Sequence, residues 1–117
     1  MICLCQWSKA PHWLLFWQTD HLFEKLVTFG HSHGIVIVND NPYSFILNTD
    51  LPLSILQVEG ARDIAIEMNS LSKSHSMPGW RMGMVASNPT FINWILKVKS
   101  NVDSGQYKPM MLAAVRA

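Results

Sequence analysis

The chain has 117 residues and a formal net charge of +1, with 49% hydrophobic and 15% charged residues. This length suffices for one small domain, and so apolar a composition excludes a disordered chain. A net charge near zero provides neither the basic field of a nucleic-acid-binding protein nor an acidic face for a cationic partner. The low charge also fits a fragment of a larger protein, in which part of the apolar surface would be covered.

Residues 1–18 differ from the rest of the chain. They hold both cysteines, Cys3 and Cys5, and no acidic residue, and they show neither helical nor strand periodicity. Two neighbouring cysteines do not make a disulfide framework, which favours the reducing cytosol. The longest apolar run, Trp13–Trp17, is too short for a membrane span or a signal-peptide core. We therefore expect a cytoplasmic protein that does not interact with membranes.

Regular patterns begin at Thr19. The next residues predict an amphipathic helix that has Thr19 or Asp20 as its N-cap and is ended by Gly34. Its apolar stripe consists of Leu22, Phe23, Leu26, Val27 and Phe29. Ile35–Val38 is a β-branched run, typical of a parallel strand that is buried on both faces. A helix leading into a buried strand is half of a βαβ unit.

The second half of the chain predicts two further strands and two helices. Residues 42–62 read mainly as loop, and Asp63–Met68 and Met82–Ser87 read as strands. One helix is expected from Pro89 to about Ser100, with apolar positions that include Phe91, Ile95, Leu96 and Val98, and another helix begins near Lys108. These elements together predict an α/β fold with a mostly parallel sheet and flanking helices.

Polar side chains follow two of the predicted strands, at the edge of a sheet where α/β proteins bind ligands. These residues are Asp40, Tyr43, Ser70, Ser72, Lys73, His75 and Arg81. A lysine in a partly buried loop without a neighbouring acid suits attack on a carbonyl, because only the neutral amine is nucleophilic. Hydroxyls with an arginine suit a phosphate, an acid can pair with a pyridine nitrogen, and a tyrosine can donate to a phenolate. The set fits pyridoxal 5′-phosphate, although a lysine and an arginine in a serine-rich loop are more often simply solvated.

Three segments carry a resemblance to a known family. They are Val38–Leu47, with the pattern D-x-P-Y, Ser70–Pro89, with S-x-S-K followed by G-W-R-x-G, and Lys97–Val115. In order, spacing and residue type, residues 19–117 resemble the central part of the large domain of a class I/II aminotransferase. These are pyridoxal-phosphate-dependent enzymes of fold type I, and the resemblance implies an α/β fold that is part of such a large domain.

The resemblance implies a catalytic role for Lys73. It matches the lysine that bonds covalently to the cofactor and then moves a proton between the substrate and the cofactor. Asp40 matches the aspartate that pairs with the pyridinium nitrogen, and Tyr43 matches the tyrosine that donates to the phenolate oxygen.

The same resemblance implies a phosphate site. Ser70 and Arg81 match two residues that hold the cofactor's phosphate, and Ser72 stands where a serine or another small residue is usual in the cofactor site. The remaining members of the motif have packing or loop-shaping roles: His75, Trp80 and Gly83.

The resemblance ends in the N-terminal part of the chain. The family has a P-N-N-P-T-G motif before the position of Thr19, and counting back from Asp40 puts its asparagine at His12, where the motif is absent. We therefore expect residues 1–18 to be an atypical segment that arose from a frameshift or a mis-start. The family's substrate-binding arginine would lie beyond this chain, so we expect the chain alone to be inactive or nearly so.

The resemblance implies transfer of an amino group between an amino acid and a 2-oxo acid, in a parent enzyme that is a homodimer. Three alternatives stay open: a pyridoxal-phosphate-dependent carbon–sulfur lyase, the aminotransferase-like sensor domain of a transcription regulator, and a gene remnant. We expect no metal and no nucleic-acid partner. His31 and His33 are more simply surface residues at a helix end, because no third ligand is evident.

Overall fold

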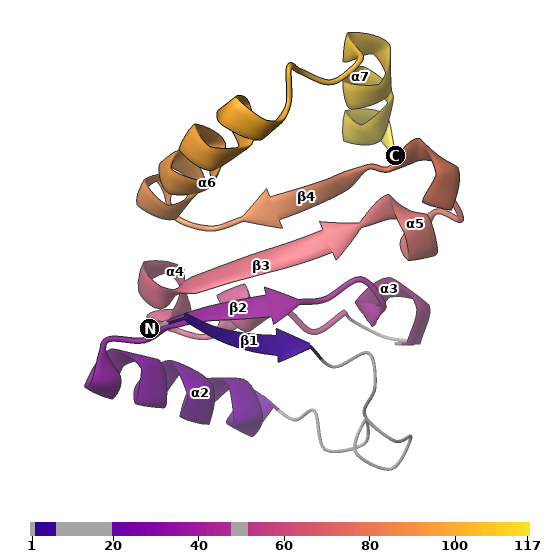
Figure 1. Ribbon diagram of the computed structural model, residues 1–117. Helices are drawn as coiled ribbons and strands as arrows, with labels where there is room; N and C mark the ends of the chain where they lie inside the picture. Colours follow the sequence, from indigo (N-terminus) through magenta and orange to yellow (C-terminus); the bar gives the residue numbers. More distant parts are fainter. Residues whose placement is uncertain (1, 7–19, 48–51) are drawn as a thin grey trace.

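The computed structural model describes residues 2–6, 20–47 and 52–117 (Figure 1). Four strands form one sheet in the order β1 (Ile2–Gln6), β2 (Val36–Asp40), β3 (Ala65–Ser70) and β4 (Gly83–Ala86). The first three strands are parallel, and β4 runs antiparallel to β3. The α/β fold with a mostly parallel sheet, predicted from the sequence, is confirmed.

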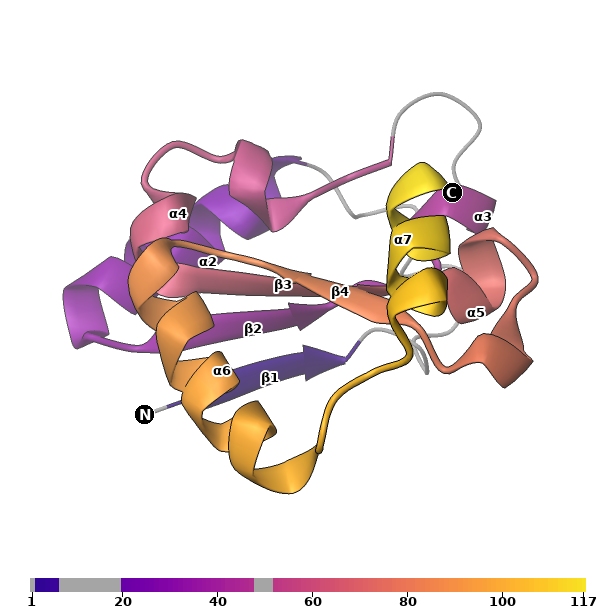
Figure 2. The ribbon, with the colours of Figure 1, turned by 90° about the horizontal axis from the view of Figure 1, so that it is seen from above.

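Helices cover both faces of the sheet. The longer ones are α2 (Asp20–His33), α6 (Pro89–Val102) and α7 (Lys108–Arg116). The short ones are α3 (Ser44–Leu47), η1 (Ile55–Gln57), α4 (Ala61–Ile64), α5 (Leu71–Ser74) and η2 (Pro78–Trp80). Figure 2 shows α2 and α4 on one side of the sheet and α6 on the other. No helix in the described ranges is long and apolar enough to cross a membrane.

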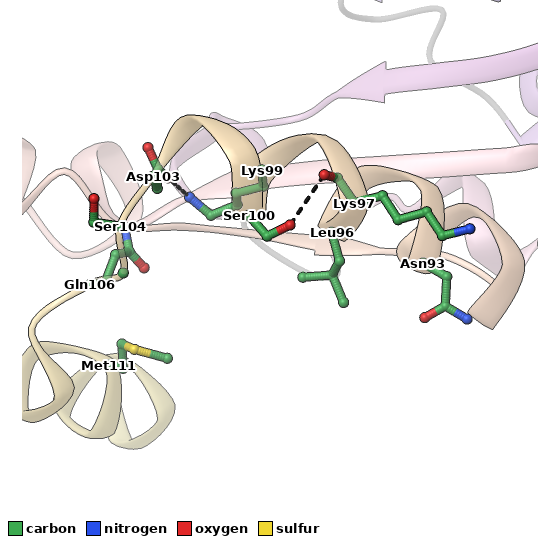
Figure 3. Close-up of a pocket in the computed structure, with 10 residues that line it drawn as sticks. Asn93, Leu96, Lys97, Lys99, Ser100, Asp103, Ser104, Gln106 and Met111 are labelled. Carbon is green, nitrogen blue, oxygen red and sulfur yellow. Dashed lines mark hydrogen bonds and ion pairs between the residues drawn. The ribbon is translucent and has the colours of Figure 1, made fainter.

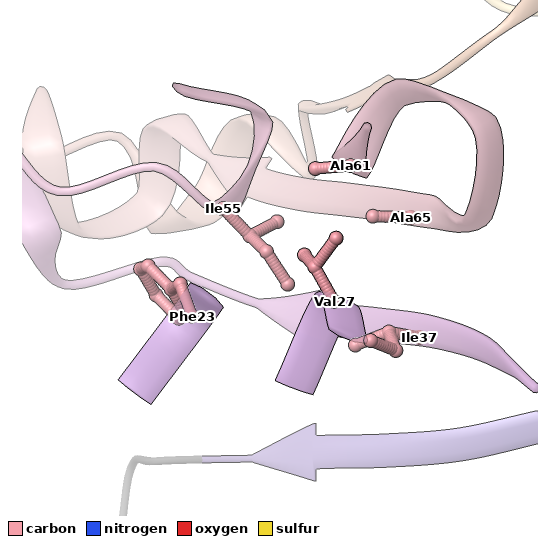
Figure 4. Packing of buried hydrophobic residues seen from close by; sticks show 6 residues of the cluster. All are labelled: Phe23, Val27, Ile37, Ile55, Ala61 and Ala65. Atoms are coloured by element: carbon pink, nitrogen blue, oxygen red, sulfur yellow. The ribbon is translucent and has the colours of Figure 1, made fainter. Parts of the chain in front are cut away.

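The larger hydrophobic core lies between α2 and the sheet (Figure 4). Its buried members are Phe23, Val27, Ile37, Ile55, Ala61 and Ala65. Phe23 and Val27 are one helical turn apart and therefore face the sheet together, as the predicted stripe requires. Phe29, which the sequence also assigned to that stripe, is half exposed, because it lies on another side of the helix.

A second core lies on the opposite face, because neighbouring residues of a strand point to opposite sides of a sheet. Val38 and Ile66, each next to a member of the first core, pack there with Phe91 of α6. Of the predicted apolar positions on α6, Phe91 is buried and Ile95 packs against this core. The other two apolar positions, Leu96 and Val98, are exposed in the part of the chain that the structure describes.

Several predicted boundaries were also wrong. β2 continues past Val38 to Asp40, because the polar Asn39 finds a hydrogen-bond acceptor on β3 and can be buried. β3 begins at Ala65 rather than Asp63, because a helical turn, α4, starts after Gly60 and includes Asp63. The predicted loop over residues 42–62 contains α3, η1 and part of α4.

The N-terminal segment contains a strand that its side-chain pattern did not predict. Ile2–Gln6 pairs in parallel with Val36–Asp40. Backbone pairing stabilises this strand, and side-chain periodicity does not report backbone pairing. Residues 7–19 lie outside the described residues, so the proposed origin of this segment stays a prediction.

Candidate cofactor site

The candidate site lies at the edge of the sheet where β2 and β3 end. Asp40 is the last residue of β2 and Ser70 the last residue of β3. The two strands are parallel and Asp40 is in register with Met68, so both carboxyl ends reach the same edge. The short helices α3 and α5 follow these ends and lie side by side (Figure 1).

The turn after Asp40 places Tyr43. The backbone N–H of Asn41 donates to the carbonyl of Met68 at 2.9 Å, which extends the β2–β3 pairing by one residue. The side-chain amide of Asn41 donates to the carbonyl of Leu53, also at 2.9 Å. The carbonyl of Tyr43 then accepts the N–H of Ile46, which closes the turn of α3. Tyr43 is half-buried at the start of that helix.

Lys73 lies on the single turn of α5, which Ser70 caps. The Ser70 hydroxyl accepts the backbone N–H of Ser72 at 3.2 Å, as expected of an N-cap serine. The Ser74 hydroxyl donates back to the carbonyl of Ser70 at 3.1 Å. The local sequence S-L-S-K-S thus supplies its own hydrogen-bond partners, and these fix the backbone that carries the lysine.

The Lys73 amine lies close to Tyr43. Its Nζ atom is 5.9 Å from the centre of the Tyr43 ring, within the range of a cation–π contact. The side chain is exposed and belongs to a helical turn. The expected partly buried loop was therefore wrong. Among the described residues, no ion pair includes Lys73.

Arg81 enters the site from the connection between α5 and β4. It ends η2 in a left-handed backbone conformation with φ +54°. Its guanidinium is exposed, and Nη1 donates to the carbonyl of Pro78 at 3.2 Å. Gly83, two residues later, is paired with Ser70. This pairing brings Arg81 to the same edge of the sheet as Ser70.

The structure therefore brings the six predicted site residues to one edge of the sheet, with direct contacts between some of them. The Lys73 amine lies near the Tyr43 ring, and the Ser70 hydroxyl accepts a hydrogen bond from the backbone N–H of Ser72. Among the described residues, the Asp40 carboxylate has no ion-pair partner. A carboxylate, a phenol, an amine, a guanidinium and hydroxyls at one edge fit the groups of pyridoxal phosphate.

Sequence reasoning missed two polar residues beside the site. The Asn69 side-chain oxygen accepts the N–H of Ser70 at 2.6 Å. The Glu67 carboxylate accepts hydrogen bonds from Asn39, just before Asp40, and from Ser54 and Ile55 farther along the chain. The signal for Glu67 was an acid inside an apolar strand pattern, at a position where a carboxylate needs partners.

Other parts of the surface offer weaker candidates. An open groove of about 730 Å³ lies between α6 and α7 and is lined by residues such as Leu96, Lys97, Gln106 and Met111 (Figure 3). It contains none of the predicted site residues.

The two histidines at the end of α2 are hydrogen-bonded to backbone carbonyls. Nε2 of His31 is hydrogen-bonded to the carbonyl of Gly60, and Nδ1 of His33 is hydrogen-bonded to the carbonyl of Phe29. In the described ranges, no three His, Cys, Asp or Glu side chains come together as metal ligands.

The family described as aminotransferase class I and II matches residues 19–117. The chain belongs to this family. The aminotransferase match covers all six predicted site residues, and the family's members are transferases that use pyridoxal phosphate. The resemblance inferred from the D-x-P-Y and S-x-S-K patterns is confirmed.

Curated relatives of this aminotransferase chain are longer enzymes. An LL-diaminopimelate aminotransferase of Aquifex aeolicus is 44% identical over 100 residues, which are 85% of this chain and 26% of the relative. One of Gloeobacter violaceus is 48% identical over 96 residues, 81% of this chain and 24% of the relative. The chain thus spans about a quarter of the length of these relatives.

Solved structures show the same arrangement of elements. An aminotransferase of Staphylococcus aureus superimposes with a TM-score of 0.78 at 26% identity, covering 97% of this chain and 35% of the other. BacF of Bacillus subtilis superimposes with a TM-score of 0.77 at 27% identity, covering 82% of this chain and 24% of BacF. The sheet and its helices are therefore part of an aminotransferase fold.

Proposed function

We propose that this chain carries the cofactor-binding centre of a pyridoxal-phosphate-dependent aminotransferase, and that Lys73 is the residue that bonds to the cofactor. One observation supports this most strongly. Lys73 extends from a capped helical turn beside Tyr43, at the same sheet edge as Asp40, and it forms no ion pair among the described residues. An amine without a carboxylate partner is free to act as a nucleophile and as a proton carrier.

Each of the other residues has a binding or orienting role in this proposal. Asp40 holds the proton on the cofactor's ring nitrogen, and Tyr43 donates to its phenolate oxygen. Ser70, Ser72 and Arg81 hold its phosphate through hydroxyl, backbone and guanidinium donors. When bound, pyridoxal phosphate supplies an electron sink for the negative charge that develops at Cα of the amino acid. Nζ of Lys73 would remove the proton from Cα of the amino donor and, in the second half of the reaction, deliver one to Cα of the acceptor.

The proposed reaction is the transfer of an amino group from an amino acid to a 2-oxo acid. LL-diaminopimelate is the first amino acid to test, because the Aquifex and Gloeobacter relatives carry the name of an aminotransferase for it. We place the protein in the cytosol and infer a homodimeric parent, on the family resemblance and the absence of a disulfide framework in its sequence.

Borohydride trapping tests the role of Lys73. The purified chain is mixed with pyridoxal phosphate, its visible absorbance is recorded, and the sample is reduced and mapped by peptide mass. We expect the label to concentrate on Lys73 and to disappear in Lys73→Ala. Lys25→Ala is the matched control, because Lys25 is an exposed lysine on α2, and it should leave the label unchanged. A label spread evenly over the lysines would contradict the proposal.

Product analysis separates the transaminase from the carbon–sulfur lyase. A full-length parent that carries this segment should convert its amino acid to the corresponding 2-oxo acid only when a second 2-oxo acid is supplied. Release of pyruvate and ammonia without an acceptor would favour the lyase. Translation of the upstream DNA in all frames tests the sensor-domain alternative, since such a regulator carries a DNA-binding domain there.

A further inference from the structure

Glu67 joins three segments of the chain through one oxygen atom. Its Oε2 accepts hydrogen bonds from the side-chain amide of Asn39 at 3.1 Å, the hydroxyl of Ser54 at 3.0 Å and the backbone N–H of Ile55 at 2.9 Å. Asn39 is only 2% exposed and Ile55 is fully buried. All three donors are neutral, and no ion pair among the described residues includes Glu67.

These hydrogen bonds lie beside Asp40. Asn39 is the residue directly before Asp40 on β2 and is the register partner of Glu67 on β3. Asn41 comes directly after Asp40. Its backbone N–H donates to the carbonyl of Met68, and its side-chain amide donates to the carbonyl of Leu53. The backbone of Asp40 is therefore fixed on both sides, and Glu67 supplies the acceptor on one of them.

The start of η1 is held by the same carboxylate. The Ser54 hydroxyl donates to Glu67 and accepts the N–H of Leu56, so it caps η1 at the same time. Leu53, which accepts the Asn41 amide, is the residue before Ser54. Glu67 is thus hydrogen-bonded to Ser54 and Ile55, and the neighbouring Leu53 accepts the Asn41 amide in the turn that leads from Asp40 to Tyr43.

Glu67 does not point toward the predicted cofactor residues. Asn39 and Glu67 follow Ile37 and Ala65 by two positions, which puts them on the sheet face that carries the larger core. Asp40 and Met68 are on the opposite face by the same alternation. Any effect of Glu67 on the site must therefore pass through the backbone of β2 and of residues 53–55.

We propose that Glu67 is a positioning residue, which holds the end of β2 so that Asp40 meets the cofactor's ring nitrogen. The part that concerns the cofactor rests on the function proposed above, and the part that concerns the backbone does not. Misplacement of a binding group by about 1 Å is enough to weaken a site strongly. A carboxylate that accepts three donors beside the key acid supplies the required rigidity.

Amide hydrogen exchange of the Glu67→Gln chain tests the backbone part without any cofactor. We expect exchange at Asn41 and Ile55 to accelerate about tenfold, the effect of losing one charge-assisted hydrogen bond, while exchange at Phe91 on the other face stays unchanged. Glu59→Gln, the same change at an exposed position, should alter none of these amides. Unchanged exchange at Asn41, or equal acceleration throughout the chain, would overturn the proposal.

A double-mutant cycle with the cofactor tests the link to Asp40. Glu67→Gln should reduce the yield of reduced label on Lys73 several-fold, whereas in an Asp40→Ala background the same change should add nothing. Equal losses in both backgrounds would show that Glu67 acts by another route and would overturn the proposal. If the unmodified chain takes no label at Lys73, the proposed function fails, and the exchange experiment still decides whether Glu67 holds the Asp40 backbone.

Discussion

Gly83 faces Asn69 so closely that a β-carbon on Gly83 would lie 2.8 Å from the Asn69 carbonyl oxygen. The two residues belong to neighbouring antiparallel strands, and Ser70, the next residue of β3, is the register partner of Gly83. This close approach sets the position at which the chain returns from α5 and η2. Glycine in the G-W-R-x-G motif is therefore required by the backbone that presents Lys73 and Arg81.

We predict that Gly83→Ala separates the ends of β3 and β4. The added methyl group meets a backbone oxygen that has little freedom to move, and overpacking of this kind costs about 1–3 kcal/mol. Urea unfolding measures the loss of stability. Gly79→Ala is the control, because a β-carbon added there would meet no other described atom within 4 Å, and it should change the free energy of unfolding by less than about 0.5 kcal/mol. Equal effects of the two substitutions would contradict the prediction.

Ile55 anchors η1 in the larger core. Its side chain is fully buried among Phe23, Val27 and Ala61. Ile55→Ala should lower the free energy of unfolding by about 2–5 kcal/mol, through lost apolar contact and the cavity left behind. The comparison variant is Ile46→Ala, the same substitution at a side chain that is 52% exposed. A loss at Ile46 as large as that at Ile55 would show that η1 is not anchored in this way.

Ser70 joins the structural and chemical parts of the site. Ser70→Ala removes the acceptor for the N–H of Ser72 and should destabilise the turn of α5 by about 1 kcal/mol. Because the same hydroxyl is a proposed phosphate donor, the borohydride label on Lys73 should fall about fivefold, the effect of one lost hydrogen bond. Ser100→Ala, at an exposed position of α6, should leave the label intact. A full label in Ser70→Ala would remove Ser70 from the site.

The sequence predicted α2, the buried strand β2 and the helix that begins at Pro89 because these elements have strong local signals. A capping residue, a continuous β-branched run and a proline at a helix start can each be recognised without tertiary information. The boundaries of β2 and β3 could not be predicted from the sequence. Asn39 and Glu67 are polar residues inside strands, and each is tolerated there only because the other strand provides its partner.

For the motif residues, the sequence likewise predicted which residues form the site but not how their side chains are placed. The patterns D-x-P-Y and S-x-S-K identified the family, and they predicted Asp40, Tyr43, Ser70 and Lys73 as site residues. Their presence at one sheet edge follows from the parallel pairing of β2 and β3. The exposure of Lys73 and its distance from Tyr43 depend on the turn of α5, which a linear pattern does not specify.

By itself, the sequence determined the α/β class and the family, and it predicted the residues that would hold the cofactor, because residue types at fixed spacing carry that information. Only the tertiary structure decided that β1 joins the sheet, that β4 runs antiparallel, and that Glu67 links β2 to the loop after α3. These features depend on backbone hydrogen bonds and on buried polar partners from distant segments. Such partners form their hydrogen bonds only once the chain has folded, so the role of either residue cannot be predicted from its own place in the sequence.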